Sequence, residues 1–132
     1  MTTEAGRPVR VEILARTDCQ SRGMARIVLE RVVDELDIPV EVEVVEITSQ
    51  AQARKRGFLG SPTVRVNGLD VEPGTNGSKE VTLGDRVYRG ERGLQGWPDA
   101  RWIRAALVVA QVAASDGGGE GDSSTRSSTT SP

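Results

Sequence analysis

The chain of 132 residues has no histidine, a single cysteine and few aromatic side chains, which make up 3% of the sequence. The absence of histidine excludes a Ser-His-Asp triad, and with only one cysteine a zinc site of nitrogen and sulfur ligands is almost excluded as well. One cysteine cannot close a disulfide within the chain, so any disulfide involves a second molecule. We expect no metal and no cofactor.

Long apolar runs are also missing, and the N-terminus lacks the apolar segment of a secretory signal. The formal net charge is only -2, because 17 basic side chains nearly balance 19 acidic ones. This balance gives no electrostatic basis for strong binding to nucleic acid or to an anionic membrane. We expect a cytoplasmic protein whose partner is neither nucleic acid nor a membrane.

The composition predicts one folded domain followed by a polar tail. Residues 115–132 consist mainly of Gly, Ser, Thr and Asp and contain no large apolar side chain. Such a segment cannot bury enough surface to offset the entropy lost on ordering. We therefore expect residues 7–114 to form a single domain and residues 115–132 to be disordered.

Hydrophobic periodicity and turn residues predict seven elements in the order β-α-β-α-β-β-α. The expected strands lie in 8–15, 40–47, 61–66 and 69–71, and the expected helices in 19–38, 48–57 and 97–114. A strand-helix-strand start implies a right-handed crossover between parallel strands, whereas Asn67-Gly68 is typical of an antiparallel hairpin. The predicted fold class is α/β, with a central mixed sheet flanked by helices. A thioredoxin-like arrangement satisfies this order.

Local signals predict where the helices begin and end. Thr17 and Asp18 are candidate N-caps of the first helix. Thr48 and Ser49 provide a cap for the second helix, and Gly57 is placed as its C′ residue. Pro98 suits the first position of the third helix. The expected buried face of the first helix is Met24, Ile27, Val28, Val32 and Leu36, and that of the third is Ile103, Ala106, Leu107 and Ala110.

Two segments resemble a known family. Cys19 stands between the first strand and the first helix, and "GSPTVRVNG" opens the third strand, which resembles thioredoxin and glutaredoxin domains. More closely, "GFLGSPTVRVNGLDVEP" and "VYRGERGLQGWPDARWIRAAL" look like the small bacterial thioredoxin-like proteins related to alkylmercury lyase, over about residues 11–107. The resemblance implies a thioredoxin fold in which Cys19 takes the first motif position and Pro62 is a cis-proline that faces it.

The resemblance also implies a set of site residues and two losses. Cys19 is the expected catalytic residue, and Ser61, Pro62, Thr63 and Arg22 are the expected substrate-binding residues. Arg22 stands where a second cysteine would resolve a disulfide, and Asp85 stands where such relatives often carry another cysteine. Beside a cis-proline, the backbone of Ser61 would be free to pair with an extended substrate.

Two functions stay open at this stage. One is a monothiol site, in which Cys19 forms a mixed disulfide with a small thiol or a partner protein; if it is an enzyme, the protein is a monothiol oxidoreductase. The other is a redox-inactive thioredoxin-fold scaffold that binds a protein or peptide, with Cys19 as a small buried apolar group. Capture of a soft metal would need thiolates from two molecules. The resemblance does not imply organomercurial cleavage or use of glutathione.

Overall fold

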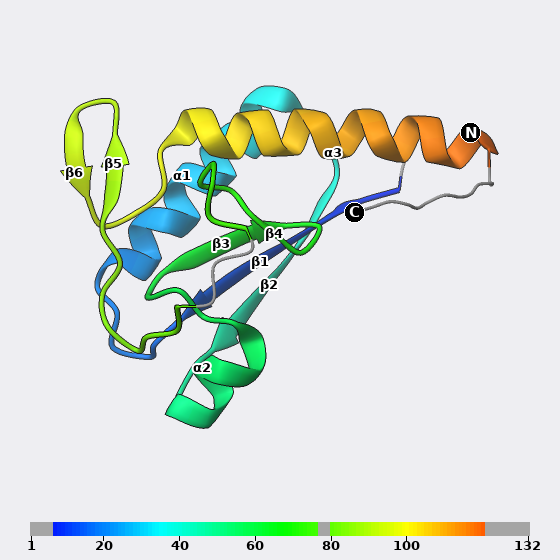
Figure 1. Cartoon of the computed structure of the whole chain (residues 1–132). Coiled ribbons are helices and arrows are strands. Elements are labelled where there is room, and N and C mark those ends of the chain that lie inside the picture. Colours follow the sequence, from blue (N-terminus) through cyan, green and yellow to red (C-terminus); the bar gives the residue numbers. More distant parts are fainter. Residues whose placement is uncertain (1–6, 77–79, 121–132) are drawn as a thin grey trace.

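The structure is a computed structural model, and it describes residues 7–76 and 80–120. Its elements follow one another in the order shown in Figure 1. They are β1 (Val9–Ala15), α1 (Ser21–Leu36), β2 (Val40–Glu46), α2 (Gln50–Arg56), β3 (Thr63–Val66), β4 (Leu69–Asp70), β5 (Tyr88–Gly90), β6 (Gly93–Gln95) and α3 (Ala100–Glu120).

A four-stranded mixed sheet forms the centre, with the strand order β2-β1-β3-β4. β1 and β2 are parallel, as the crossover through α1 requires, and the pairs β1–β3 and β3–β4 are antiparallel. The turn between β3 and β4 is formed by Asn67 and Gly68, whose φ angles of 51° and 85° lie in the left-handed region. The predicted α/β class and the Asn-Gly hairpin are confirmed.

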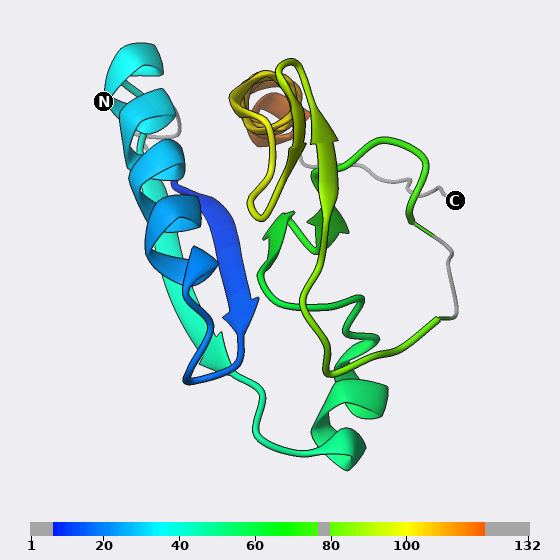
Figure 2. The ribbon, with the colours of Figure 1, turned by 90° about the vertical axis from the view of Figure 1, so that its left-hand side faces the viewer.

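The helices cover both faces of this sheet, so that successive residues of β1 enter different cores (Figures 1 and 2). Val11 and Ile13 belong to the larger core, which the sheet forms with α1 and α3. Leu14 points to the opposite face and belongs to a smaller core, together with Ala53 of α2 and with Phe58, which follows that helix. Alternation along a strand places neighbouring side chains on opposite faces, which explains why β1 becomes continuously apolar near its end.

The predicted buried face of α1 is confirmed in part, because Val32 is buried and Val28 and Leu36 pack against the core. Ala25, Leu29 and Val32 are buried at a spacing of four and three residues, whereas Met24 is 37% and Ile27 48% exposed. The small Ala25 side chain is thus on the face that packs against the sheet and α3. The buried face of α3 is confirmed, since Ile103, Leu107 and Ala110 are all buried.

β5 and β6 form a separate two-stranded sheet, which the sequence analysis did not predict. Neither strand joins the four-stranded main sheet. The hairpin leads directly into α3, and Figure 2 shows it beside the start of that helix. The observed order therefore has two strands more than the predicted one.

The ends of α2 are confirmed, but those of α1 and α3 need correction. The Ser49 hydroxyl caps α2 by accepting from Gln52 N at 3.1 Å, and Gly57 ends it in the left-handed conformation. α3 begins after Asp99, whose carboxylate accepts from Arg101 N, so Pro98 precedes the helix and does not occupy its first position. α3 continues to Glu120, past the expected domain boundary at residue 114, and residues 121–132 lie outside the described part.

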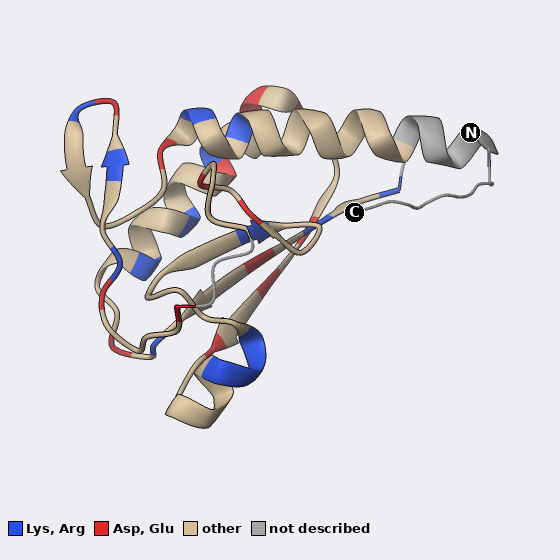
Figure 3. Cartoon of the chain, in the orientation of Figure 1, with Lys and Arg blue, Asp and Glu red and all other residues tan. Residues whose placement is uncertain are grey.

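Basic and acidic residues are both distributed over many elements of the chain, as Figure 3 shows. α3 is the exception, because neither acidic nor basic side chains interrupt its middle part (Figure 3). That stretch includes the exposed residues Val109 and Val112 as well as the buried Leu107. Within the described residues, no helix combines the length and apolar character needed to cross a bilayer.

Candidate functional site

Cys19 lies in the turn that connects β1 to α1. Its backbone N–H donates to Arg16 O at 3.2 Å, and its carbonyl accepts from Arg22 N at 3.4 Å. α1 begins at Ser21, and Gln20 is the N-cap without a side-chain hydrogen bond. The predicted N-caps, Thr17 and Asp18, are therefore wrong. Cys19 precedes the first helical turn and is 8% exposed, so only a narrow approach to it is open.

The Ser61–Pro62 peptide bond is cis, the isomer that the sequence analysis expected. The Ser61 hydroxyl accepts a hydrogen bond from Arg16 N at 3.0 Å, which ties this segment to the turn that carries Cys19. Arg16 thus bonds Cys19 through its carbonyl and Ser61 through its N–H. The turn before α1 and the segment before β3, which are far apart in the sequence, are joined at one place.

Tyr88 contacts the Ser61–Pro62 segment from a third direction. Its hydroxyl donates to Pro62 O, and its ring is fully buried against Trp102, with the ring centroids 6.1 Å apart. Burial raises the pKa of Tyr88 above its ordinary value, Arg86 opposes this, and the negative charges of Asp70 and Glu72 add to the increase. The Tyr88 hydroxyl is therefore a neutral donor to this segment.

The positive charge of Arg22 is paired with a carboxylate and not with Cys19. Its guanidinium pairs with Glu46 on β2, at a distance of 3.7 Å. Half-exposed and engaged with a carboxylate, it lies on the side of α1 that faces the end of β2. The role in substrate binding that the resemblance implies for Arg22 stays a prediction.

Arg16 is the charged residue that does contact this region, and the sequence analysis missed it. Its guanidinium donates to Asp18 Oδ1 at 3.1 Å, to Leu83 O at 2.7 Å and to Asp85 Oδ1 at 2.8 Å. The hydrogen bond from Arg16 lowers the pKa of Asp18, and among the described residues no side chain caps the start of α1. No local pattern reveals such a role, because Leu83 and Asp85 are far from Arg16 in the sequence.

The backbone of Ser61 is not free, contrary to expectation. Its N–H donates to Gly84 O at 2.9 Å, and its carbonyl accepts from Arg86 N at 2.9 Å. These two bonds form a parallel β-bridge between Ser61 and Asp85. A segment of the same chain therefore occupies the strand edge at which an extended substrate had been expected to pair.

Thr63 has an equally complete set of partners. Its fully buried hydroxyl donates to Gly60 O at 2.7 Å and accepts from Arg86 Nη1 at 3.0 Å. Both hydrogen-bonding roles of that hydroxyl are thus taken within the chain. The structure joins Ser61 to the Cys19 turn through Arg16, and it uses the polar groups of Ser61 and Thr63 internally. The substrate-binding role of Ser61, Pro62 and Thr63 stays a prediction.

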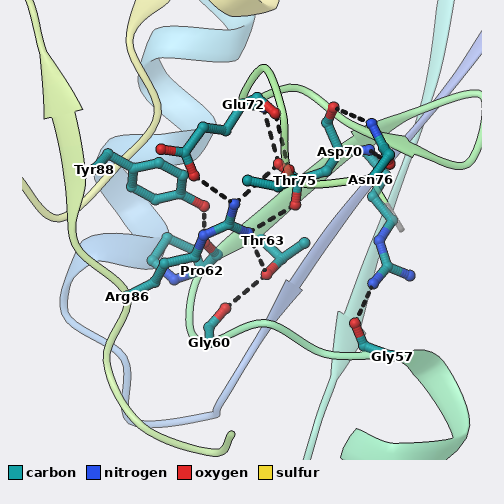
Figure 4. Close-up of polar contacts among 11 residues, drawn as sticks. Gly57, Gly60, Pro62, Thr63, Asp70, Glu72, Thr75, Asn76, Arg86 and Tyr88 are labelled. Atoms are coloured by element: carbon teal, nitrogen blue, oxygen red, sulfur yellow. Dashed lines mark hydrogen bonds and ion pairs between the residues drawn. The ribbon is translucent and has the colours of Figure 1, made fainter. Parts of the chain in front are cut away.

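A buried arginine cluster is the second feature that sequence reasoning missed (Figure 4). The Arg86 guanidinium donates to both carboxylate oxygens of Asp70, at 2.7 and 3.0 Å, and to Glu72 Oε1 at 2.8 Å. It also lies over the Tyr88 ring, 4.5 Å from the centroid. Burial would lower the pKa of Arg86, but the hydrogen bonds and charges of Asp70, Tyr88 and Glu72 outweigh it, so the pKa is raised.

Two hollows lie near these elements. One, of about 450 Å³, is next to the buried cluster and is lined by Leu59, Glu72, Thr75, Val81, Thr82 and Arg86, among others. The other, of about 440 Å³, lies between β4 and α3 and is lined mainly by apolar side chains, among them Leu69, Val71, Trp102 and Val109. In the described part of the chain, no group of three or more His, Cys, Asp or Glu residues is arranged to hold a metal ion.

No family model matches the chain, and neither a curated protein nor a solved structure matches it. What the site can do must therefore be argued from its geometry.

Proposed function

We propose that the protein is a thioredoxin-like protein with a monothiol site, and that Cys19 forms a mixed disulfide with a thiol from outside the chain. The arrangement of the elements supports this fold: a parallel β1–β2 pair joined through α1, an antiparallel β3–β4 hairpin, and helices on both faces of the sheet. Cys19 lies at the junction of β1 and α1, where the resemblance places the reactive thiol.

One observation carries the proposal. Arg16 links Cys19 and Ser61 through its own backbone, so the turn that carries the single cysteine is joined to the Ser61–Pro62 segment. Tyr88 contacts the same segment through Pro62 O. These hydrogen bonds support a fixed position of the Cys19 turn, which a defined approach of a second sulfur requires.

The chemistry available to one thiol is exchange in two external steps. The Cys19 thiolate attacks one sulfur of a disulfide RSSR, a Cys19–SR bond forms, and RS⁻ leaves and takes up a proton. Because the chain has no second cysteine, the mixed disulfide persists until another thiol, R′SH, attacks it as the thiolate. That step forms RSSR′ and restores Cys19, so no internal electron donor is needed.

Intact-protein mass spectrometry after incubation with oxidised glutathione or hydroxyethyl disulfide tests this function. The expected result is one adduct on the folded chain, its loss on adding dithiothreitol, and no adduct on the Cys19→Ser variant. The urea-unfolded chain is the control that shows the reagent to be competent. If only the unfolded chain forms the adduct, Cys19 is not a reactive site and the proposal fails.

A redox-inactive scaffold that binds a protein or peptide is the second candidate. Two observations favour it: Cys19 is nearly buried, and Arg22, which stands in the place of a second cysteine, pairs with Glu46. Cys19→Ser distinguishes the two functions in cells that depend on the protein. A scaffold keeps its biological activity in the Ser variant, whereas a monothiol site loses it while circular dichroism shows an unchanged fold.

A further inference from the structure

The strand edge at Ser61 is closed by the protein itself. Both backbone hydrogen-bonding groups of Ser61 are bonded to the segment 84–86, through Gly84 O and Arg86 N. Binding of an extended peptide by strand addition requires free N–H and C=O groups at an edge. At Ser61 these groups are already used, so the edge offers no pairing site to a peptide.

From this closure, we propose that the segment 84–86 restricts the reaction partners of Cys19 to low-molecular-weight thiols and disulfides and excludes extended peptides. The inference rests on the proposed monothiol function and deepens it, since it names the class of partner. It is carried by the bridge at Ser61 and not by the presence of the cysteine.

Two arginines hold the segment 84–86 in place from opposite ends. On the side of the Cys19 turn, Arg16 donates to Leu83 O and to the exposed carboxylate of Asp85. On the other side, the side chain of Arg86 enters the buried cluster with Asp70. A peptide that displaced the segment would have to break the bridge and also expose this ion pair.

A close backbone approach shows that the closure is built into the sequence. Gly60 has a φ of 119°, and a Cβ atom at this position would lie 3.0 Å from Arg86 Cβ. Only glycine fits both the conformation and the space. The segment 84–86 therefore packs against a position made for it, directly before Ser61.

The partner class follows from what each reagent needs. A small disulfide requires only that one of its sulfur atoms reaches Cys19, which is 8% exposed. A cysteine within a peptide brings flanking backbone with it, and this backbone meets the segment 84–86 where it would otherwise pair with Ser61. Selectivity thus arises from the backbone on either side of the reacting sulfur and not from the sulfur itself.

The test compares two neutral reagents with the same leaving group. One is hydroxyethyl 2-pyridyl disulfide, and the other is a blocked, Thr- and Val-rich peptide whose central cysteine carries the 2-pyridyl disulfide. Release of pyridine-2-thione gives the rate of reaction with Cys19 for each reagent. On the folded chain, we expect the peptide to react at least about tenfold more slowly than the small reagent, because two backbone hydrogen bonds oppose it. On the urea-unfolded chain, we expect similar rates.

A variant that loosens the segment 84–86, called here an opening variant, tests whether this segment causes the slower reaction of the peptide. Asp85→Ala removes the exposed contact with Arg16, and it should accelerate hydrogen exchange of the Arg86 amide and raise the relative rate of the peptide. Asp34→Ala, an exposed change of the same charge on α1, is the matched control and should change neither. If hydrogen exchange of the Arg86 amide is unchanged in Asp85→Ala, Gly60→Ala replaces it as the test variant, because its added Cβ atom would displace Arg86.

The outcomes separate this inference from the proposed function. Equal rates for both reagents on the folded chain overturn the inference and leave the monothiol function standing. The same result follows if exchange at Arg86 accelerates in an opening variant while the selectivity stays unchanged. Failure of both reagents on the folded chain, with reaction of the unfolded chain, instead overturns the monothiol function itself.

Discussion

The Arg86 guanidinium donates two hydrogen bonds, of 2.7 and 3.0 Å, to the Asp70 carboxylate, and both side chains are almost completely buried. This pair joins β4 to the segment that closes the Ser61 edge. Buried ion pairs contribute little net stability over apolar packing, but loss of one partner leaves an uncompensated buried charge. The pair therefore fixes where Arg86 and the segment 84–86 lie relative to β4.

Arg86→Met is the variant that exposes this dependence. It leaves the Asp70 carboxylate buried without its cation, so we expect the free energy of unfolding to fall by about 3–5 kcal/mol. Arg26→Met is the matched control, because Arg26 pairs with Glu30 at the surface of α1, and it should cost less than about 1 kcal/mol. Urea unfolding of both variants measures the difference. Equal costs would contradict a structural role for the buried pair.

The hydroxyl of Tyr88 gives a second prediction. Tyr88→Phe keeps the buried ring but removes the donor to Pro62 O, so that carbonyl loses its side-chain partner. We expect a loss of about 1–3 kcal/mol in the free energy of unfolding. Val87→Ala, at the exposed neighbouring position, serves as the control and should stay within about 0.5 kcal/mol. A neutral Tyr88→Phe variant would show that this hydrogen bond is not important.

Two glycines in helical segments should respond in opposite directions to the same substitution. Gly23 lies within α1 with open space around it, so Gly23→Ala should stabilise the protein by about 0.5–1 kcal/mol. Gly57 ends α2 with a φ of 62°, and Gly57→Ala should destabilise it by about 1–2 kcal/mol. Shifts of the urea midpoint at an unchanged m-value measure both. Shifts of the same sign would contradict the assigned backbone conformations.

The parts of the fold that the sequence predicted are those with local causes. Asn67-Gly68 and the pair Ser49 and Gly57 carry backbone preferences that act within a few residues, so the hairpin and the limits of α2 were found in advance. The resemblance also led to the cis bond before Pro62. Each of these signals is contained in a short segment.

The errors have tertiary causes. The Asp18 carboxylate did not cap α1 because the Arg16 guanidinium competes for it. The burial of Arg86 depends on Asp70 and on Glu72, which are 16 and 14 residues away, and no periodicity marks such a partnership. The same holds for Ser61, because its closure depends on where the chain returns after β4.

Asp99 supplies the last prediction, which concerns pH. Its carboxylate is buried at the start of α3 and accepts hydrogen bonds from the Arg101 side chain, from Arg101 N at 2.8 Å and from Glu91 N at 2.7 Å. The bond from the Arg101 side chain, with smaller help from the two backbone groups, lowers the pKa of Asp99 to about 2 against the effect of burial. The ionised carboxylate thus joins the β5–β6 hairpin to α3 more strongly than the neutral acid does.

Because the pKa of Asp99 is lower in the folded state than the ordinary value of 3.8, its contribution is complete above pH 3.8 and is lost as the pH falls toward 2. Asp99→Asn keeps an acceptor oxygen but cannot ionise. We expect it to be less stable than the unmodified chain by about 1–2 kcal/mol at neutral pH, with the difference shrinking between about pH 4 and pH 2. Asp34→Asn, an exposed change on α1, controls for the loss of one carboxylate. Urea unfolding at several pH values provides the measurement, and a difference that stays constant down to pH 2 would show that ionised Asp99 does not hold this junction.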